Sequence, residues 1–309
     1  MIDELSCLAE RRVTSIGGPQ YGRRMSVSRR QLLLGAMAIA AGGGIWGTGL
    51  FPQRDRERGV AGGRAGTLSR LMVRDPTGRV SRVFVWRSAG SDSALVPVLY
   101  LLHGVPGTAA GAVTTGVVAA TAAAVGAGLG PLVLVIPDGN GVRADTEWAD
   151  ASDGKDLVAS RVIRSVIPAV EGNHPRLRRQ RAIAGFSMGG YGAANLALQH
   201  PDLFGQWCSL DGYFRIDDPD KVFVDDTARD ANSPDRHAVA GSDQRVLLIE
   251  SRSEQGKLIP GEAARMQGLL NAAGAQVTVW KPSGPHSWTF VVSQWRPLLE
   301  WLKPGWIAV

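Results

Sequence analysis

The sequence predicts an α/β protein built on a doubly wound, mostly parallel sheet with helices on both faces. Continuous apolar runs that end at turn residues, such as 96–102 and 131–136, are typical of strands buried on both faces. Segments with apolar residues at helical spacing lie between such runs, for example 157–170. Strands that alternate with helices form a parallel sheet, and the active site of such a sheet lies at the carboxyl ends of its strands.

Each expected element has its own signal in the chain. A run that alternates polar and apolar residues predicts an antiparallel edge strand over 80–86. The expected parallel strands are 96–102, 131–136, 181–184, 207–210, 246–249 and 276–280. The expected helices are 157–170, 191–200, which Pro201 stops, 261–273, which Gly274 closes, and one at the C-terminus.

The chain divides into an N-terminal extension (1–51), a linker (52–66) and a catalytic domain (67–309). Arg29 and Arg30 precede an uncharged, glycine-rich apolar run to Leu50, which resembles a twin-arginine export signal. An uncleaved anchor is the alternative, and Met25 would be a natural start for such a signal. We expect a secreted or envelope-associated protein that contacts the membrane only through this segment, if it stays uncleaved.

The charge distribution and the cysteines limit the possible partners. The formal net charge is +6, and most of it lies in the first 60 residues, so no nucleic-acid partner is expected. Cys7 precedes the export segment and Cys208 is alone in the domain, which predicts a buried free thiol and no intrachain disulfide. The carboxylates of the polar insertion over 211–243 lack the spacing of a calcium loop. We therefore expect no metal and no cofactor.

A glycine-lined serine motif marks the expected catalytic centre. The G-x-S-x-G pattern around Ser187 follows an apolar strand and precedes a helix, which is the context of a nucleophile elbow. Gly185 and Gly189 would avoid a collision where strand and helix cross, and Gly190 and Gly192 would let the helix lie close to the sheet. Serine is a poor nucleophile near neutral pH, so a base must lie within hydrogen-bond reach.

The position of His286 makes it the expected base, because it follows the last strand and precedes the C-terminal helix. His174, His200 and His237 lie at helix ends or in the polar insertion. The acid that orients the base is expected after the strand 246–249, and Glu254 is the first choice because its loop can turn back toward His286. Glu250 and Asp243 are the alternatives. Ser187, Glu254 and His286 follow the order of α/β-hydrolase triads.

The remaining expected site residues come from two other loops and from the residues after His286. The backbone N–H groups of Val105 and Met188 are the expected oxyanion donors. His103 is expected to shape the oxyanion loop and to contribute to the substrate site. Trp148 and Trp288 are the other expected substrate-binding residues.

Four motifs resemble those of the esterase D family. They are Leu99–Gly104, Ile136–Gly141, Gly185–Gly190 and His286–Trp288, and the likeness extends over about residues 67–303. That family includes S-formylglutathione hydrolases, feruloyl and acetyl-xylan esterases, and antigen 85 mycolyltransferases. The resemblance implies an α/β-hydrolase fold with a triad at Ser187, Glu254 and His286 and oxyanion donors at Val105 and Met188.

The expected function is therefore that of an exported serine esterase that acts on a small-molecule or cell-envelope ester. Acyl transfer of the mycolyltransferase type is an alternative, because transfer and hydrolysis share the same acyl-enzyme. Hydrolysis is favoured because the loop after Leu102 offers one hydroxyl and no charge to an acceptor, although Asp138, Asn140, Arg143 and Trp148 could bind a sugar. The alternative from another class is an inactive relative that binds a carbohydrate or cell-wall partner.

Overall fold

The computed structural model describes residues 66–307 except 92, 217, 219 and 254–258. The expectations for the export segment, the linker and the start at Met25 fall outside these residues, as does Glu254. No helix within the described ranges has both the length and the apolar character needed to cross a membrane.

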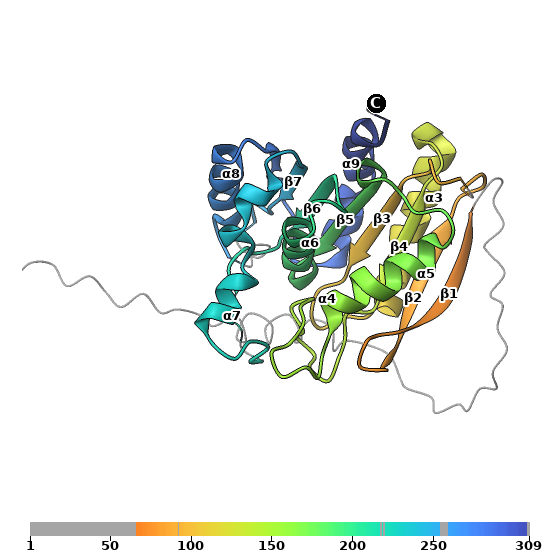
Figure 1. The fold of residues 1–309 in the computed structure, drawn as a ribbon. Helices are drawn as coiled ribbons and strands as arrows, with labels where there is room; N and C mark the ends of the chain where they lie inside the picture. Colours follow the sequence, from red (N-terminus) through yellow and green to blue (C-terminus); the bar gives the residue numbers. More distant parts are fainter. Residues whose placement is uncertain (1–65, 92, 217, 219, 254–258, 308–309) are drawn as a thin grey trace, which may run out of the picture. The chain divides into compact units, whose positions relative to one another are not determined.

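An eight-stranded sheet with the strand order β1-β2-β4-β3-β5-β6-β7-β8 forms the centre of the domain (Figure 1). Its strands are β1 (Thr67–Arg74), β2 (Val80–Arg87), β3 (Val98–Leu102), β4 (Val133–Pro137), β5 (Arg181–Phe186), β6 (Gln206–Leu210), β7 (Arg245–Ile249) and β8 (Gln276–Trp280). From β4 to β8 all neighbouring strands are parallel, whereas β2 is antiparallel to both β1 and β4. The strand expected at the edge is thus β2, and β1 lies outside it.

Helices and single turns connect these strands. They are α2 (Ala109–Thr114), α3 (Val117–Ala124), η1 (Val125–Leu129), α4 (Val158–Ser160), η2 (Arg161–Val166), α5 (Ile167–Glu171), η3 (Arg178–Gln180), α6 (Met188–Gln199), α7 (Asp226–Ala231), η4 (Pro234–Arg236), η5 (Ala238–Gly241), α8 (Glu262–Ala272) and α9 (Trp288–Ile307). The helix expected over 191–200 begins earlier, at Met188, directly after the serine of the elbow. The segment between β6 and β7 holds α7, η4 and η5.

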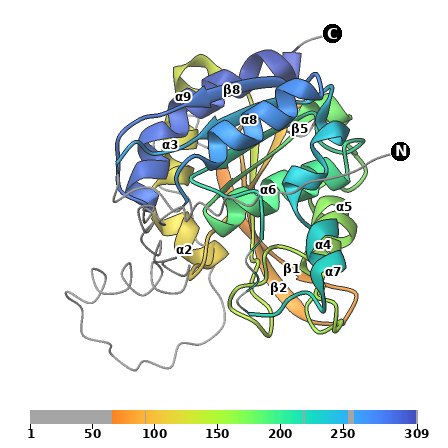
Figure 2. The same ribbon diagram turned by 90° about the vertical axis from the view of Figure 1, so that its left-hand side faces the viewer.

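The sheet is covered on both faces, as the sequence predicts. Figure 2 shows α3 and α9 on one side of it and α4, α5 and α6 on the other. Alternate residues of β3 serve the two cores: Val98, Tyr100 and Leu102 belong to the core on the α6 side, and Leu99 and Leu101 to the core on the α9 side. All five are completely buried, which explains why the central strands read as continuous apolar runs.

Cys208 lies on β6 and is buried, as expected for a small hydrophobic residue. Burial raises the pKa of its thiol well above the usual range, so the thiol stays protonated.

Candidate active site

Ser187 occupies the turn between β5 and α6 in a backbone conformation that is rare for a residue with a side chain. Its φ is 58° and its ψ is −121°, which is the strained geometry of a nucleophile elbow. Its N–H donates to the Leu210 carbonyl oxygen at 3.0 Å, and its carbonyl accepts from Gly190 and Tyr191. The residue is 2% exposed, so its backbone is fixed on the sheet and on the helix at once.

The glycines of the elbow permit this turn by close backbone contacts. A Cβ on Gly185 would overlap the Gly189 carbonyl, and a Cβ on Gly189 would overlap the Leu102 carbonyl. A Cβ on Gly190 would lie 2.6 Å from Ser209 Oγ on β6. Gly192 has a different role from the one expected, because it makes room for the Trp148 side chain rather than for the sheet.

His286 lies beside the elbow, in the loop between β8 and α9. Its imidazole packs against the ring of Phe186, the residue before Ser187, with ring centroids 4.6 Å apart. Both ring nitrogens are buried, and neither forms a hydrogen bond with any described residue. Its ring nitrogens are therefore available to the elbow serine and to a carboxylate, as a general base requires.

The carboxylate nearest to His286 is Asp211, which the sequence analysis did not select. Asp211 Oδ2 lies 3.5 Å from His286 Nδ1, and the Asp211 side chain is 1% exposed. Its other oxygen, Oδ1, accepts a 2.6 Å hydrogen bond from the Ser251 N–H. Asp211 directly follows β6 and has a φ of 46°. The sequence signal available for Asp211 was its position at the end of a parallel strand and before a glycine.

The alternatives to Glu254 as the acid are engaged elsewhere. Glu250 Oε1 accepts from the N–H groups of Gly261 and Ala263 at the start of α8, and Glu250 Oε2 lies 3.9 Å from Lys281 Nζ. Asp243 precedes β7, at the opposite end of that strand, and pairs with Arg178 at 2.7 Å. Neither carboxylate is paired with His286.

Ser251 connects the loops that carry Asp211 and His286. In addition to the bond from its N–H to Asp211, its Oγ donates to the Gly284 carbonyl at 2.6 Å. Gly284 precedes His286 by two residues, and Ser251 is completely buried. Through these two hydrogen bonds, Ser251 connects the loops that follow β6, β7 and β8.

The loop after β3 passes directly over the elbow. A Cβ on Gly104 would lie 2.9 Å from the Ser187 Cβ, so only glycine permits this approach. Val105 follows in this loop and is half-buried. Met188 is the first residue of α6, so its N–H has no acceptor within the helix. These two N–H groups remain the candidate oxyanion donors.

His103 supports this loop and does not face a substrate. The side chain is completely buried, its Nδ1 lies 2.9 Å from the Gly104 carbonyl oxygen, and its Nε2 accepts from the Gly139 N–H at 2.9 Å. Because Nε2 accepts the Gly139 N–H, the tautomer that fits these contacts has its hydrogen on Nδ1, which donates to the Gly104 carbonyl. The expectation that His103 binds substrate is therefore corrected, whereas its expected role in shaping the loop agrees with these contacts.

Trp148 is likewise buried, and its assignment to substrate binding is corrected for the same reason. Its Nε1–H donates to the His103 carbonyl at 3.0 Å, and its ring fills the space left by Gly139 and Gly192. Trp288, at the start of α9, is half-buried and packs against Phe186 with ring centroids 5.5 Å apart. Of the three expected substrate residues, it is the one that is partly exposed, and it contacts the residue before Ser187.

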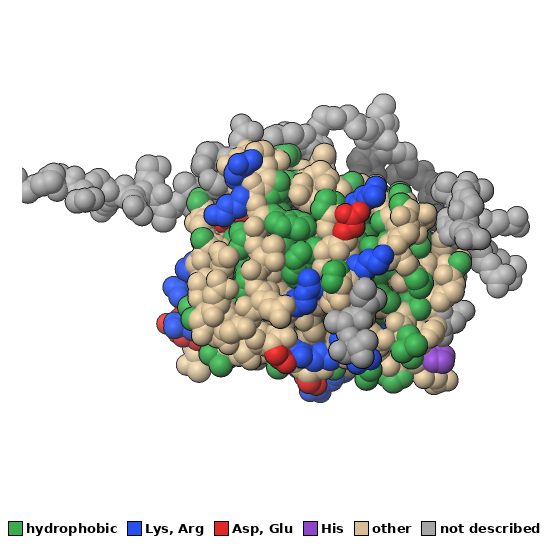
Figure 3. Space-filling model, turned by 90° about the horizontal axis from the view of Figure 1, so that it is seen from above, with side chains coloured by type: hydrophobic (Ala, Val, Ile, Leu, Met, Phe, Trp, Pro, Cys, Tyr) green, Lys and Arg blue, Asp and Glu red, His purple; other side chains and the backbone are tan. Residues whose placement is uncertain are grey.

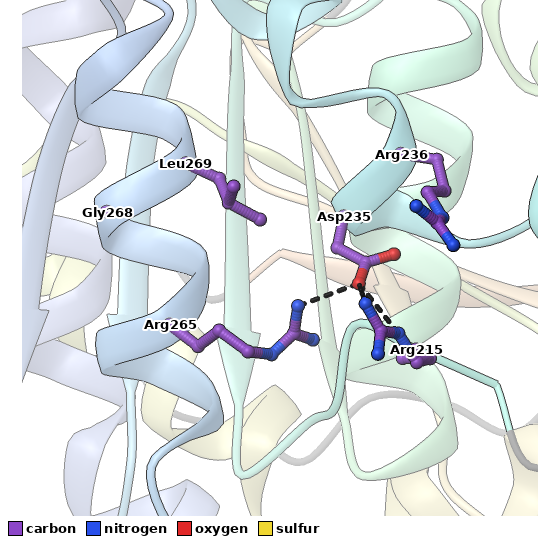
Figure 4. Close-up of a pocket in the computed structure, with 6 residues that line it drawn as sticks. All are labelled: Arg215, Asp235, Arg236, Arg265, Gly268 and Leu269. Carbon is purple, nitrogen blue, oxygen red and sulfur yellow. Dashed lines mark hydrogen bonds and ion pairs between the residues drawn. The ribbon is translucent and has the colours of Figure 1, made fainter. Parts of the chain in front are cut away.

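A separate cavity of about 410 Å³ lies between α8 and the segment that follows Asp211 (Figure 4). Its centre is Asp235, whose Oδ2 accepts from Arg265 Nη1 at 2.7 Å and from Arg215 Nε at 3.0 Å. Arg265 also pairs with Glu262, which accepts from the Phe214 N–H. This cavity includes none of the triad candidates, and its ion pairs tie the 211–243 segment to α8.

Comparisons with known proteins agree with this fold. The family model described as "Putative esterase" matches residues 78–297. A ferulic acid esterase structure is 18% identical with a TM-score of 0.66, covering 78% of this chain and 99% of its own. S-formylglutathione hydrolase from Agrobacterium tumefaciens is 18% identical with a TM-score of 0.68, covering 79% and 97%. MPT51 from Mycobacterium tuberculosis is 21% identical with a TM-score of 0.60, covering 78% and 99%.

At these identities the solved structures establish the fold alone, which is that of the α/β-hydrolases. The family match covers most of the described domain, from the start of β2 to the middle of α9. This chain therefore belongs to the esterase family.

Proposed function

We propose that this protein hydrolyses carboxylic acid esters through an acyl-enzyme on Ser187, with His286 as base and Asp211 as the acid that orients it. The observation that carries the proposal is the meeting of an elbow serine, an imidazole and a buried carboxylate at the carboxyl ends of β5, β6 and β8. The sequence predicts Ser187 and His286, and the 3.5 Å distance from His286 to Asp211 supports Asp211 as the third member.

The proposed reaction has two half-reactions, acylation and deacylation of Ser187, and the same groups act in both. Ser187 Oγ attacks the ester carbonyl carbon while its proton moves to His286 Nε2, and the Met188 and Val105 N–H groups bind the developing oxyanion. Asp211 keeps the proton of the neutral imidazole on Nδ1 and stabilises the imidazolium. The alcohol leaves with the proton from Nε2. Water then repeats the sequence on the acyl-enzyme and releases the carboxylic acid.

Substitution of the nucleophile tests this proposal. Ser187→Ala should lower kcat for p-nitrophenyl esters on the order of a millionfold, because the chemistry of the triad depends on it. Ser209→Ala is the matched control, since Ser209 is a buried serine whose Oγ has no hydrogen-bond partner among the described residues. A fluorophosphonate probe should label the parent and the Ser209 variant. Labelling that persists in Ser187→Ala would contradict the assignment.

Hydrolysis is proposed over acyl transfer because the loop above the elbow, 105–110, has one hydroxyl side chain and no charge to orient an alcohol. A transferase must bind its acceptor well enough to compete with water at about 55 M. Incubation of an activated ester with millimolar glycerol or sugar measures the partition. Acylated acceptor in large excess over free acid would favour the transferase.

We also propose export through the twin-arginine route, supported by the Arg29-Arg30 pair before the apolar run. Replacing both residues by lysine should retain the protein in the cytoplasm. Continued export of the lysine variant, measured by cell fractionation, would favour another route or a simple anchor.

A further inference from the structure

A second cavity, of about 380 Å³, lies at the end of the sheet opposite the catalytic groups. Its lining consists of Arg87, Ser91, Val170, Glu171, His174 and Arg176. Arg87 ends β2 opposite Val133, the first residue of β4, so the cavity lies at the amino ends of the parallel strands. Ser187 and Asp211 follow the carboxyl ends of β5 and β6. Figure 3 looks onto the amino-end side, where visible Lys and Arg side chains predominate over Asp and Glu.

The one carboxylate of this lining is already neutralised by a residue outside it. Glu171 forms a 2.8 Å ion pair with Arg181, which is also buried. Both Glu171 oxygens are saturated, because they accept from the Tyr100 hydroxyl, from two Arg181 nitrogens and from the Arg176 N–H. Glu171 therefore has little capacity left to balance a further cation.

Neither arginine of the lining pairs with a carboxylate among the residues that the structure describes. Arg176 is 6% exposed, and its guanidinium donates to three backbone carbonyls, those of Val96, His174 and Ser93. Arg87 Nη2 donates to the Val170 carbonyl at 2.7 Å, and no hydrogen bond to a described residue uses its other nitrogens. Within the described ranges, no ion pair of 4.0 Å or less includes either guanidinium.

Carbonyl oxygens accept from each of the three Arg176 nitrogens and from one Arg87 nitrogen, but they carry only partial negative charge. A buried cation without a counter-charge is costly, so proteins normally pair it. Burial lowers the pKa of the Arg176 guanidinium; Glu171 opposes this change, and the neighbouring charge of Arg87 adds to it. Both arginines line the same cavity, so their like charges repel each other, and a bound anion would relieve both.

We propose that this cavity binds a tetrahedral oxyanion, a phosphate group, between Arg87 and Arg176. The Ser91 hydroxyl and the exposed His174 ring offer further donors at its edge. Two sources share this chemistry, a free phosphate ion and the headgroup of an anionic phospholipid. The lipid is included because Thr67 pairs with Arg87 in the sheet register. The expected N-terminal anchor would therefore join the domain beside the cavity.

Titration of the full-length protein with inorganic phosphate, followed by calorimetry, tests the site. The parent should bind saturably, and Arg87→Gln should weaken binding at least about tenfold, since one charge-assisted contact is lost. Arg87→Lys should lose less. Arg82→Gln is the matched control, because Arg82 is an exposed arginine at the other end of β2, and it should change the affinity less than about twofold. Ser187→Ala should bind phosphate like the parent, so this result does not depend on the esterase proposal.

Vesicles distinguish the two sources. Co-sedimentation of the protein with phosphatidylglycerol vesicles is compared with its co-sedimentation with phosphatidylcholine vesicles. A preference for phosphatidylglycerol that Arg87→Gln reduces and Arg82→Gln does not reduce identifies the headgroup as the ligand. Phosphate binding without such vesicle binding identifies a free ion. Equal effects of the Arg87 and Arg82 variants, or no Arg87-dependent binding in either experiment, would overturn the proposal. Phosphate binding that is absent in the parent and appears in Asp92→Asn would also overturn the proposal, because Asp92 would then be the counter-charge of the arginines.

Discussion

Replacing Asp211 by asparagine removes one charge and changes almost no volume, so it isolates the role of the carboxylate at His286. The Ser251 N–H requires an acceptor at the position of Asp211 Oδ1, which it reaches at 2.6 Å. The asparagine oxygen will occupy that position, which leaves the amide nitrogen at the position of Oδ2, 3.5 Å from His286 Nδ1. The amide would then donate to Nδ1 and place the imidazole proton on Nε2. In that tautomer His286 cannot accept the proton of Ser187.

The same substitution in Ser-His-Asp enzymes lowers kcat about 10⁴-fold, which corresponds to about 5 kcal/mol of activation free energy. We expect a loss of this size for Asp211→Asn in p-nitrophenyl acetate hydrolysis, with an unchanged thermal midpoint. Glu250→Gln is the control, because its oxygen can still accept from the start of α8, and it should lose less than about threefold. Retention of activity within tenfold in Asp211→Asn, together with a thousandfold loss in Glu254→Gln, would refute the assignment and restore the acid expected from the sequence.

Two further predictions concern stability. Asp235→Asn should lower the free energy of unfolding by about 1 kcal/mol, because Arg265 and Arg215 lose their shared carboxylate but are partly exposed; an unchanged urea midpoint would contradict this. For Glu171, burial alone would raise the pKa, but the hydrogen bonds from Arg181 and from the Arg176 N–H offset it, so its pKa lies below the usual value. Its contribution to stability is therefore fully present above about pH 4.5 and is lost as the pH falls through the lowered pKa, so the parent should lose more stability than Glu171→Gln between pH 5 and 3.

The fold was predictable from the sequence because its main signals are local. The buried strands are continuous apolar runs. A run such as Val98–Leu102 is apolar at every position because its side chains alternate between the two hydrophobic cores. The outermost strand, β1, was not predicted. Its residues are mostly exposed, so neither alternation nor a continuous run marks it. Pairing with β2 supplies its backbone hydrogen bonds, and local sequence does not reveal such a partner.

The candidate site could be predicted only where its residues lie in local motifs. Ser187 is marked by glycines that the tight turn requires, and His286 by its place between the last strand and the last helix. The acid has no comparable motif. Any carboxylate after a parallel strand can reach the same edge of the sheet, and the choice between the ends of β6 and β7 depends on loop geometry. The motifs place His103 and Trp148 near this edge of the sheet, but local sequence does not indicate that both side chains are buried.

Two members of the candidate triad, Ser187 and Asp211, share a backbone arrangement with Glu250. Ser187, which follows β5, donates its N–H to the carbonyl of the last residue of β6. Asp211, which follows β6, donates to the last residue of β7, and Glu250, which follows β7, donates to the last residue of β8. Each parallel ladder thus extends one residue beyond its strand. The left-handed φ values of Ser187 and Asp211 then turn the chain away immediately. Such conformations cost about 1–3 kcal/mol each and persist only where the surroundings hold them. Here the ladder holds the backbone on the sheet side, and both residues are buried at the carboxyl edge of the sheet, which favours a preorganised site.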